Sequence, residues 1–150
     1  MNPSLSELLM GNVAAVSEPP PPEAMGDFLT SKISVIAMIS LLGAQEAEKG
    51  VAVTVAENRR LRDLFARTAP AWDVRLGGRL AEAAKGEDAD LRVSALDAAN
   101  ASLREVLIAL HEAVEADASA EARTLDAEII ALYGEMARAR RLDLPPMSAT

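Results

Sequence analysis

Hydrophobic residues recur in alternating steps of three and four between residues 93 and 114, and this spacing strongly limits what the chain can fold into. The series is Val93, Leu96, Asn100, Leu103, Leu107, Leu110 and Val114, with Asn100 as its polar member. In an α-helix this spacing places all the side chains on one face, as in the seam of a coiled coil. The sequence therefore predicts a long helix that packs one apolar face against other helices.

Two more stretches carry the same spacing. One series is Ala44, Ala47, Val51, Thr54, Asn58, Leu61 and Phe65, and the other is Ala122, Leu125, Ile129, Leu132, Met136 and Ala139. Lys49-Gly50 suits a helix end and residues 54–57 fit a capping box, but the first series continues through both. Because one internal glycine costs a helix only ~1 kcal/mol, we expect a single helix over 27–69, with room for a bend near Gly50. A hairpin at that point is the alternative.

Shorter segments surround these long ones. Residues 4–16 can form an amphipathic helix, and the prolines at 19–22 cannot continue it. Residues 72–85 fit a short helix that ends at a glycine. Asp88 or Asp90 is then placed to cap the next helix.

Together these segments predict an all-α fold, namely an antiparallel helical bundle with coiled-coil-like long helices and a separate short N-terminal helix. We divide the chain into an N-terminal amphipathic helix and proline-rich linker (1–23), a helical bundle domain (24–146) and a disordered tail (147–150).

Composition excludes several classes of partner. The net charge of −8 opposes the phosphate backbone, so we expect no nucleic-acid partner and no anionic membrane surface. The chain has no cysteine, which removes disulfides and thiolate chemistry and suits a cytoplasmic location. The most apolar stretch, residues 33–44, is shorter than the ~20 residues that a membrane span needs. Abundant Ala, with Arg in excess of Lys, predicts a bacterial chain from a GC-rich genome.

The sequence shows no pattern typical of a catalytic, cofactor or metal site. His111 is the single histidine, and with Glu112 and Glu115 it offers too few ligands for a zinc or di-iron site. Neither a Gly-x-Ser-x-Gly nucleophile elbow nor a Gly-x-x-x-x-Gly-Lys phosphate loop occurs. The arginines within 59–62 are expected to form a solvated face. We therefore predict no catalytic residue, no cofactor, no metal and no enzymatic activity.

Two asparagines occupy seam positions. Asn58 and Asn100 are each followed three residues later by Leu and then by Arg and an acidic residue, at an offset of 42 residues. Convergence on a coiled-coil seam is the preferred explanation, and a duplicated helix is the alternative. An unpaired buried amide costs ~1–3 kcal/mol. We therefore expect Asn58 and Asn100 to lie near each other in adjoining helices, where they fix the register and play no catalytic part.

Residues 33–44 are apolar on nearly every side of the predicted helix, so a three-helix core cannot cover them. The N-terminal helix or a second copy of the chain must cover the remainder. We expect the second copy, in an isologous dimer whose interface includes Ile33, Ile36, Ile39 and Leu42.

These observations predict a non-catalytic interaction protein, of an adaptor or chaperone-like kind, that forms a homodimer and can also bind another protein. The alternative function is a helical bundle that binds a small apolar ligand in a cavity between its helices.

Overall fold

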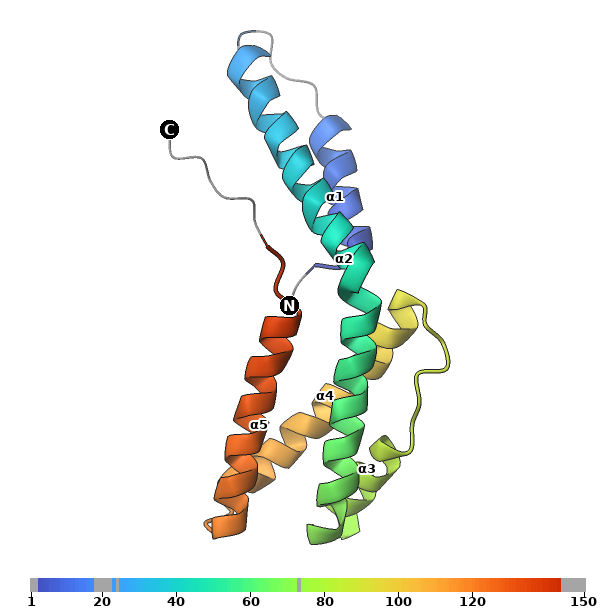
Figure 1. The fold of residues 1–150 in the computed structure, drawn as a ribbon, viewed down its shortest axis with the longest axis vertical. Coiled ribbons are helices and arrows are strands. Elements are labelled where there is room, and N and C mark those ends of the chain that lie inside the picture. The colour runs from blue at the N-terminus through green and yellow to red at the C-terminus, as the bar shows by residue number, and fades with distance from the viewer. Residues whose placement is uncertain (1–2, 18–22, 24, 73, 144–150) are drawn as a thin grey trace. The chain divides into compact units, whose positions relative to one another are not determined.

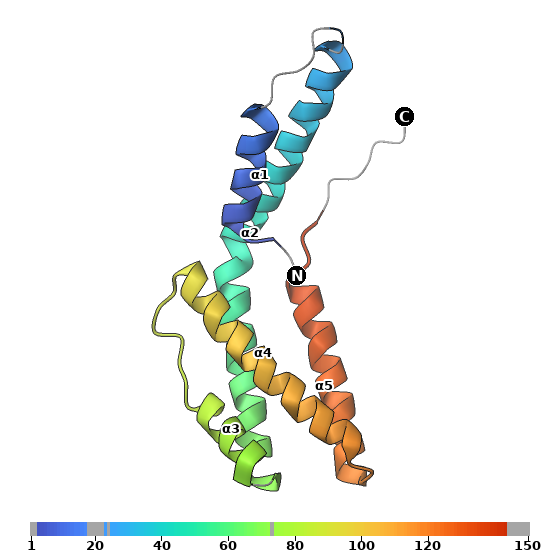
Figure 2. The same cartoon turned by 180° about the vertical axis from the view of Figure 1, so that it is seen from behind.

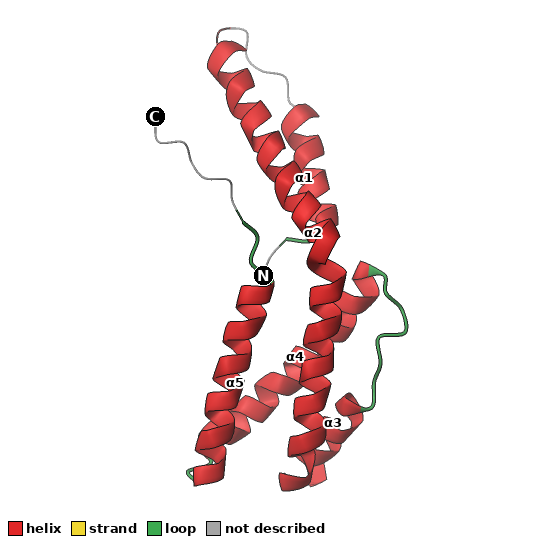
Figure 3. Ribbon diagram, viewed as in Figure 1, coloured by secondary structure: helices red, strands yellow, loops and turns green. Residues whose placement is uncertain are grey.

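Helices make up nearly all of the chain in the computed structural model, which describes residues 3–17, 23, 25–72 and 74–143 (Figure 1). The elements are α1 (Leu5–Ser17), α2 (Met25–Thr68), the short 3-10 helix η2 (Ala69–Ala71), α3 (Val74–Ala84), α4 (Val93–Ala116) and α5 (Ala120–Ala139). No strand occurs among the described residues (Figure 3). The predicted all-α helical bundle is therefore confirmed for this part of the chain. The proline run at 19–22 and the predicted tail at 147–150 lie outside it.

α2 is one continuous helix of 44 residues that passes through Gly50. The prediction of a single helix over 27–69 is confirmed, and the alternative hairpin near Gly50 is wrong. The physical reason is that a lone glycine costs little, while the same face of the helix stays apolar on both sides of it. The capping-box pattern at 54–57 does not mark a helix start, because Thr54 and Glu57 are buried inside this helix.

The chain divides into two compact units, and α2 contributes to both. We call residues 1–50 with 140–150 the hairpin unit, and residues 51–139 the core unit. The domain boundary predicted at residue 24, after the proline run, stays a prediction. The two compact units divide within α2, because its N-terminal half packs with α1 and its C-terminal half packs with later helices.

The core unit joins the C-terminal half of α2 to α3, α4 and α5. In Figure 2, α4 runs obliquely across this half of α2 toward the start of α5. The residues buried at its centre are Leu61, Leu64, Phe65, Leu80, Leu103, Leu107, Leu110, Val114, Ala122 and Ile129. Aliphatic side chains therefore form most of this core, as the low aromatic content of the sequence requires.

The spacing that predicted the long helices also identifies their buried faces. In α4 the buried residues are Leu96, Asn100, Leu103, Leu107, Leu110 and Val114. Val93, the first member of the predicted series, is exposed because it is the first residue of the helix. In α2 the predicted series becomes buried only at Thr54, inside the core unit. Spacing thus predicts the inward face wherever neighbouring helices are present to cover it.

Leu107→Ala should lower the free energy of unfolding by about 2–5 kcal/mol, because the side chain is 0% exposed and its truncation leaves a cavity. The matched control is Ile108→Ala on the same helix, where the side chain is 53% exposed and the change should stay within about 0.5 kcal/mol. Urea unfolding followed by circular dichroism measures both. Equal losses for the two variants would contradict this placement of the core.

Candidate functional site

The hairpin unit packs α1 closely against the N-terminal half of α2 at two glycines. A Cβ atom at Gly43 would lie 3.3 Å from Leu5 Cδ1, and one at Gly11 would lie 3.7 Å from Ile39 Cδ1. The two helices lie side by side in both ribbon views (Figure 1, Figure 2), and Leu8 of α1 is buried. Glycine at position 43 lets the two helices approach without displacing Leu5, whereas a Cβ at Gly11 would make only ordinary contact with Ile39.

α1 begins with a capping box made by Ser4 and Glu7. The Ser4 backbone N–H donates to Glu7 Oε2 at 2.7 Å, and the Glu7 backbone N–H donates to Ser4 Oγ at 3.2 Å. The bond from the Ser4 backbone, helped by the Ser4 hydroxyl, holds the pKa of the Glu7 carboxyl below its usual value. The Ser-x-x-Glu spacing is the sequence signal of such a box, so this helix start could have been identified from residues 4–7.

The side of α2 turned away from α1 is apolar and exposed, and we call it the open face. It consists of Ile33, Ser34, Ala37, Met38 and Leu41, all of which are exposed. At about 100° per residue, Ile33, Ala37 and Leu41 form one row along the helix, with Ser34 and Met38 beside it. The sequence has no charged residue between Ile33 and Ala44, so the open face carries no charge.

The residues predicted to form an interface lie on two different sides of α2. Ile33 is on the open face, whereas Ile36, Ile39 and Leu42 are partly buried. Ile39 lies against Gly11 of α1. The sequence offered the N-terminal helix and a second copy as alternative covers for this stretch. α1 covers one side of it within the chain and leaves the open face uncovered.

Residues 141–143 are attached to α2 just beyond the open face. The side-chain amide of Gln45 donates to the carbonyl of Asp143 and accepts from its backbone N–H, each at 2.8 Å. One turn later, the Lys49 ammonium donates to the carbonyl of Arg141. Because both ends of the Gln45 amide are paired with main chain, this segment has a defined place at the C-terminal end of the hairpin unit.

In the core unit, a chain of hydrogen bonds links five polar side chains. Asn100 of α4 donates through Nδ2 to Asn58 Oδ1 at 2.9 Å and to Glu57 Oε1 at 2.8 Å. Asn58 then donates to Asp88 Oδ1 at 3.0 Å. Asp88 accepts two bonds from the Arg62 guanidinium, at 2.7 and 3.0 Å. The prediction that Asn58 and Asn100 lie near each other is confirmed, while their role in fixing the register stays a prediction.

Arg62 and Asp88 form an ion pair that is largely shielded from water. Their side chains are 13% and 6% exposed, and the two-bond geometry is the strong form of an arginine–carboxylate contact. The hydrogen bonds from Arg62, helped by the one from Asn58, hold the pKa of Asp88 below its usual value despite its burial. This pair fixes the segment between α3 and α4 against α2.

The sequence predicts other positions for Arg62 and Asp88. Asp88 or Asp90 was expected to cap α4, but Asp88 bonds to α2, Asp90 pairs with Arg92, and the N-cap residue Arg92 makes no side-chain capping bond. Arg62 was expected on a solvated face and is instead partly buried. The sequence does contain an indication that Arg62 is partly buried. Arg62 follows the seam residue Asn58 by four positions, and residues four apart share a helix face.

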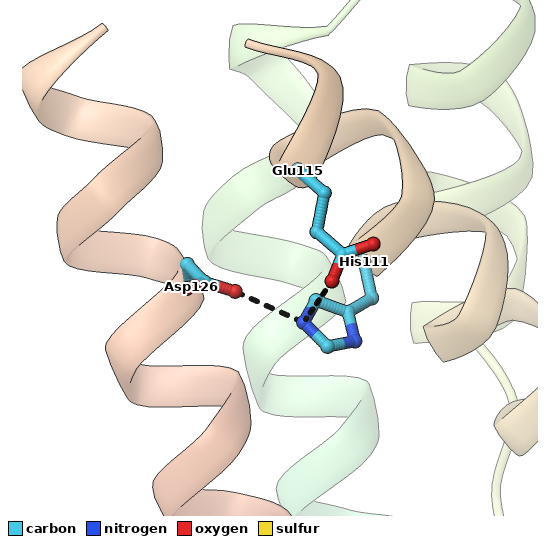
Figure 4. Close-up of side chains that lie close together, drawn as sticks. All are labelled: His111, Glu115 and Asp126. Carbon is cyan, nitrogen blue, oxygen red and sulfur yellow. Dashed lines mark hydrogen bonds and ion pairs between the residues drawn. The ribbon is translucent and has the colours of Figure 1, made fainter. Parts of the chain in front are cut away.

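His111 contacts a carboxylate that the sequence analysis did not consider. Its Nε2 lies 2.9 Å from Asp126 Oδ1 of α5 and 3.8 Å from Glu115 Oε1 of its own helix (Figure 4). The ring also lies against Tyr133, with centroids 5.5 Å apart, and burial raises the pKa of that phenol. Asp126 is distant in sequence and comes close because α4 and α5 pack together.

These three groups have a spacing that could hold a metal ion. Glu112, which the sequence analysis weighed as a third ligand, is not among them. With a single imidazole and an exposed Glu115, the arrangement is that of a histidine–carboxylate contact between neighbouring helices, and we assign it that role.

Comparisons with protein-family models, with curated proteins and with solved structures found no match. Across the described residues, none of the helices combines the length and apolar character needed to cross a membrane.

Asn100→Leu should lower the free energy of unfolding by about 1–3 kcal/mol, because Asn58 Oδ1 and Glu57 Oε1 lose this buried donor. The control is Ala101→Leu, the same new side chain at the next, exposed position, where little change is expected. Urea denaturation compares them. Unchanged stability in Asn100→Leu would show that the bonds donated by Asn100 contribute nothing to the fold.

Asp88→Asn should cost on the order of 3 kcal/mol near neutral pH, because Arg62 stays shielded from water without its counter-charge. The pKa of Asp88 is lower in the folded chain than in the unfolded chain, where it is ~3.9. The ionised carboxylate therefore makes its whole contribution to stability at pH values above ~3.9. That contribution is lost as the pH falls through the lower folded value. The stability gap between wild type and Asp88→Asn should therefore be constant above about pH 5 and narrow in acid.

Urea midpoints measured across a pH series give this gap. Asp97→Asn, on an exposed part of α4, serves as the control. A gap that widens in acid would contradict the assigned pairing.

Proposed function

We propose that this chain is a non-catalytic helical interaction protein, of the adaptor or chaperone-like kind, that forms a homodimer through the open face of α2. One observation carries the proposal: the open face is exposed, apolar and uncharged. The lack of cysteine and the Ala- and Arg-rich composition support a bacterial, cytoplasmic setting.

Covering the open face is energetically favourable. Burying apolar surface stabilises an assembly by about 25 cal/mol per Å², and a contiguous exposed patch favours aggregation when nothing covers it. Leu29 and Val35 are also exposed, on either side of the open face, and extend the apolar surface around the helix. The hairpin unit therefore gains by packing against another apolar helix surface.

A second copy of the chain suits this face well. The net charge of −8 makes two copies repel each other over most of their surfaces, but the open face contributes nothing to that repulsion. Two hairpins that meet through such faces pack α2 on the α2 of the second copy, with each α1 on the far side, and a closed two-fold pair of this kind is the commonest form of homo-oligomer. A small apolar ligand between helices, the other function considered, would leave the open face uncovered.

The test is the mass of the purified chain in solution, measured by light scattering at micromolar concentration. Wild type should be a dimer, and Ile33→Asp, which puts a charge on the open face, should be a monomer with unchanged helix content. The matched control is Ile130→Asp on α5, because the two isoleucines are equally exposed (58% and 56%) and only one is on the open face. This control should stay a dimer.

A monomeric wild type would overturn self-association, and the open face would then require a different protein as its cover. A dimer that survives Ile33→Asp would place the interface elsewhere on the chain.

A further inference from the structure

The three side chains in Figure 4 converge on one point from two helices. His111 and Glu115 lie four residues apart on α4 and so share a face of that helix, while Asp126 approaches from α5. One nitrogen of the imidazole and one oxygen of each carboxylate lie within 4.8 Å of one another. In addition to the contact that they make between the helices, these groups therefore offer a set of three metal ligands.

The distances between these atoms are close to those that a zinc ion requires. Ligand atoms bound about 2.0–2.1 Å from a tetrahedral Zn²⁺ lie roughly 3.3 Å from one another. His111 Nε2 is 2.9 Å from Asp126 Oδ1 and 3.8 Å from Glu115 Oε1, and these values lie on either side of that separation. The Glu115 side chain is 65% exposed, so it has room to move inward, and water has access to the fourth position.

Packing and charge both prepare this point for a cation. The His111 side chain is only 20% exposed, and its ring lies against Tyr133 with the centroids 5.5 Å apart, which limits how far Nε2 can turn from the carboxylates. Among the residues that the structure describes, neither Glu115 nor Asp126 forms an ion pair with a lysine or an arginine. Their negative charge therefore remains available to a divalent ion, and the net charge of −8 draws cations toward the chain.

We propose that His111, Glu115 and Asp126 bind one divalent transition-metal ion of the zinc type, which clamps α4 to α5 near the turn between them. One nitrogen with two oxygens suits zinc and its neighbours, whereas Mg²⁺ and Ca²⁺ prefer oxygen ligands alone. The sequence predicts no metal because the ligands considered there all lie within residues 111–115, and α5 supplies the missing one.

Equilibrium dialysis of the purified chain against Zn²⁺ measures how many ions bind and how tightly. Wild type should bind one ion per chain at micromolar concentration. His111→Gln should weaken this binding roughly tenfold or more, because even a group that only supports a metal ligand contributes about 10–100-fold to affinity. Glu115→Gln and Asp126→Asn should weaken it as well. The matched control is Glu112→Gln, at an exposed glutamate of the same helix outside the cluster, and this variant should keep the wild-type affinity.

Thermal unfolding gives a second measurement. Zn²⁺ should raise the unfolding midpoint of wild type, because the unfolded chain does not hold the three ligands together. It should leave the midpoint of Glu115→Gln nearly unchanged, while Mg²⁺ at the same concentration should shift neither midpoint. Glu115 is mostly exposed, so this variant should fold normally whatever the effect of His111→Gln on stability.

A wild-type chain that binds no Zn²⁺ in this range would overturn the proposed site, and so would binding that persists unchanged in Glu115→Gln and Asp126→Asn. Equal stabilisation by Zn²⁺ and Mg²⁺ would also overturn it, because that result would reflect a general attraction of cations to an acidic chain. None of these results would affect the proposed dimer, because the cluster lies in the core unit and the open face lies in the hairpin unit.

Discussion

The packing of the core unit depends on a row of buried hydrogen bonds from Asn100 through Asn58 to Asp88 and Arg62. An amide or carboxylate removed from water must find a partner, and the partners here come from three places: α2, α4 and the segment between α3 and α4. A shift of either long helix by one turn would separate these polar groups, although leucine side chains of the two helices would still pack on one another. We expect the apolar core alone to tolerate several alignments and the polar row to select one of them.

The spacing of apolar residues was sufficient to predict the helices and most of the buried positions in the core unit. It was also sufficient to bring Asn58 and Asn100 together, because two seam amides need each other in an apolar core. The spacing could not predict the contact of Asp88 with α2, because Asp88 lies outside any helix. It also could not predict the contact of Asp126 with His111, which forms only because α4 packs on α5. Contacts of this kind depend on how segments meet in space, and local periodicity contains no information about that.

α2 has two halves that differ in how they obtain specificity. From Thr54 onward its buried face carries polar residues, which accept only certain neighbours. From Ile33 to Ala44 it carries no charge, and Leu5 of α1 approaches it closely at Gly43. The first kind of surface selects its partners by hydrogen bonding, and the second selects them by shape and by the absence of repulsion. One helix thus serves a defined core at one end and an adaptable surface at the other.

The bond between Gln45 and the main chain of Asp143 joins residues that are 98 positions apart. During synthesis, α1 and the first half of α2 leave the ribosome long before residue 143 does, and chains fold progressively as they emerge. The hairpin unit must therefore wait for the whole core unit to be made before its last pieces can attach. Throughout that interval the uncharged side of α2 is already exposed, so the dimer proposed above would have the opportunity to form before either chain is complete.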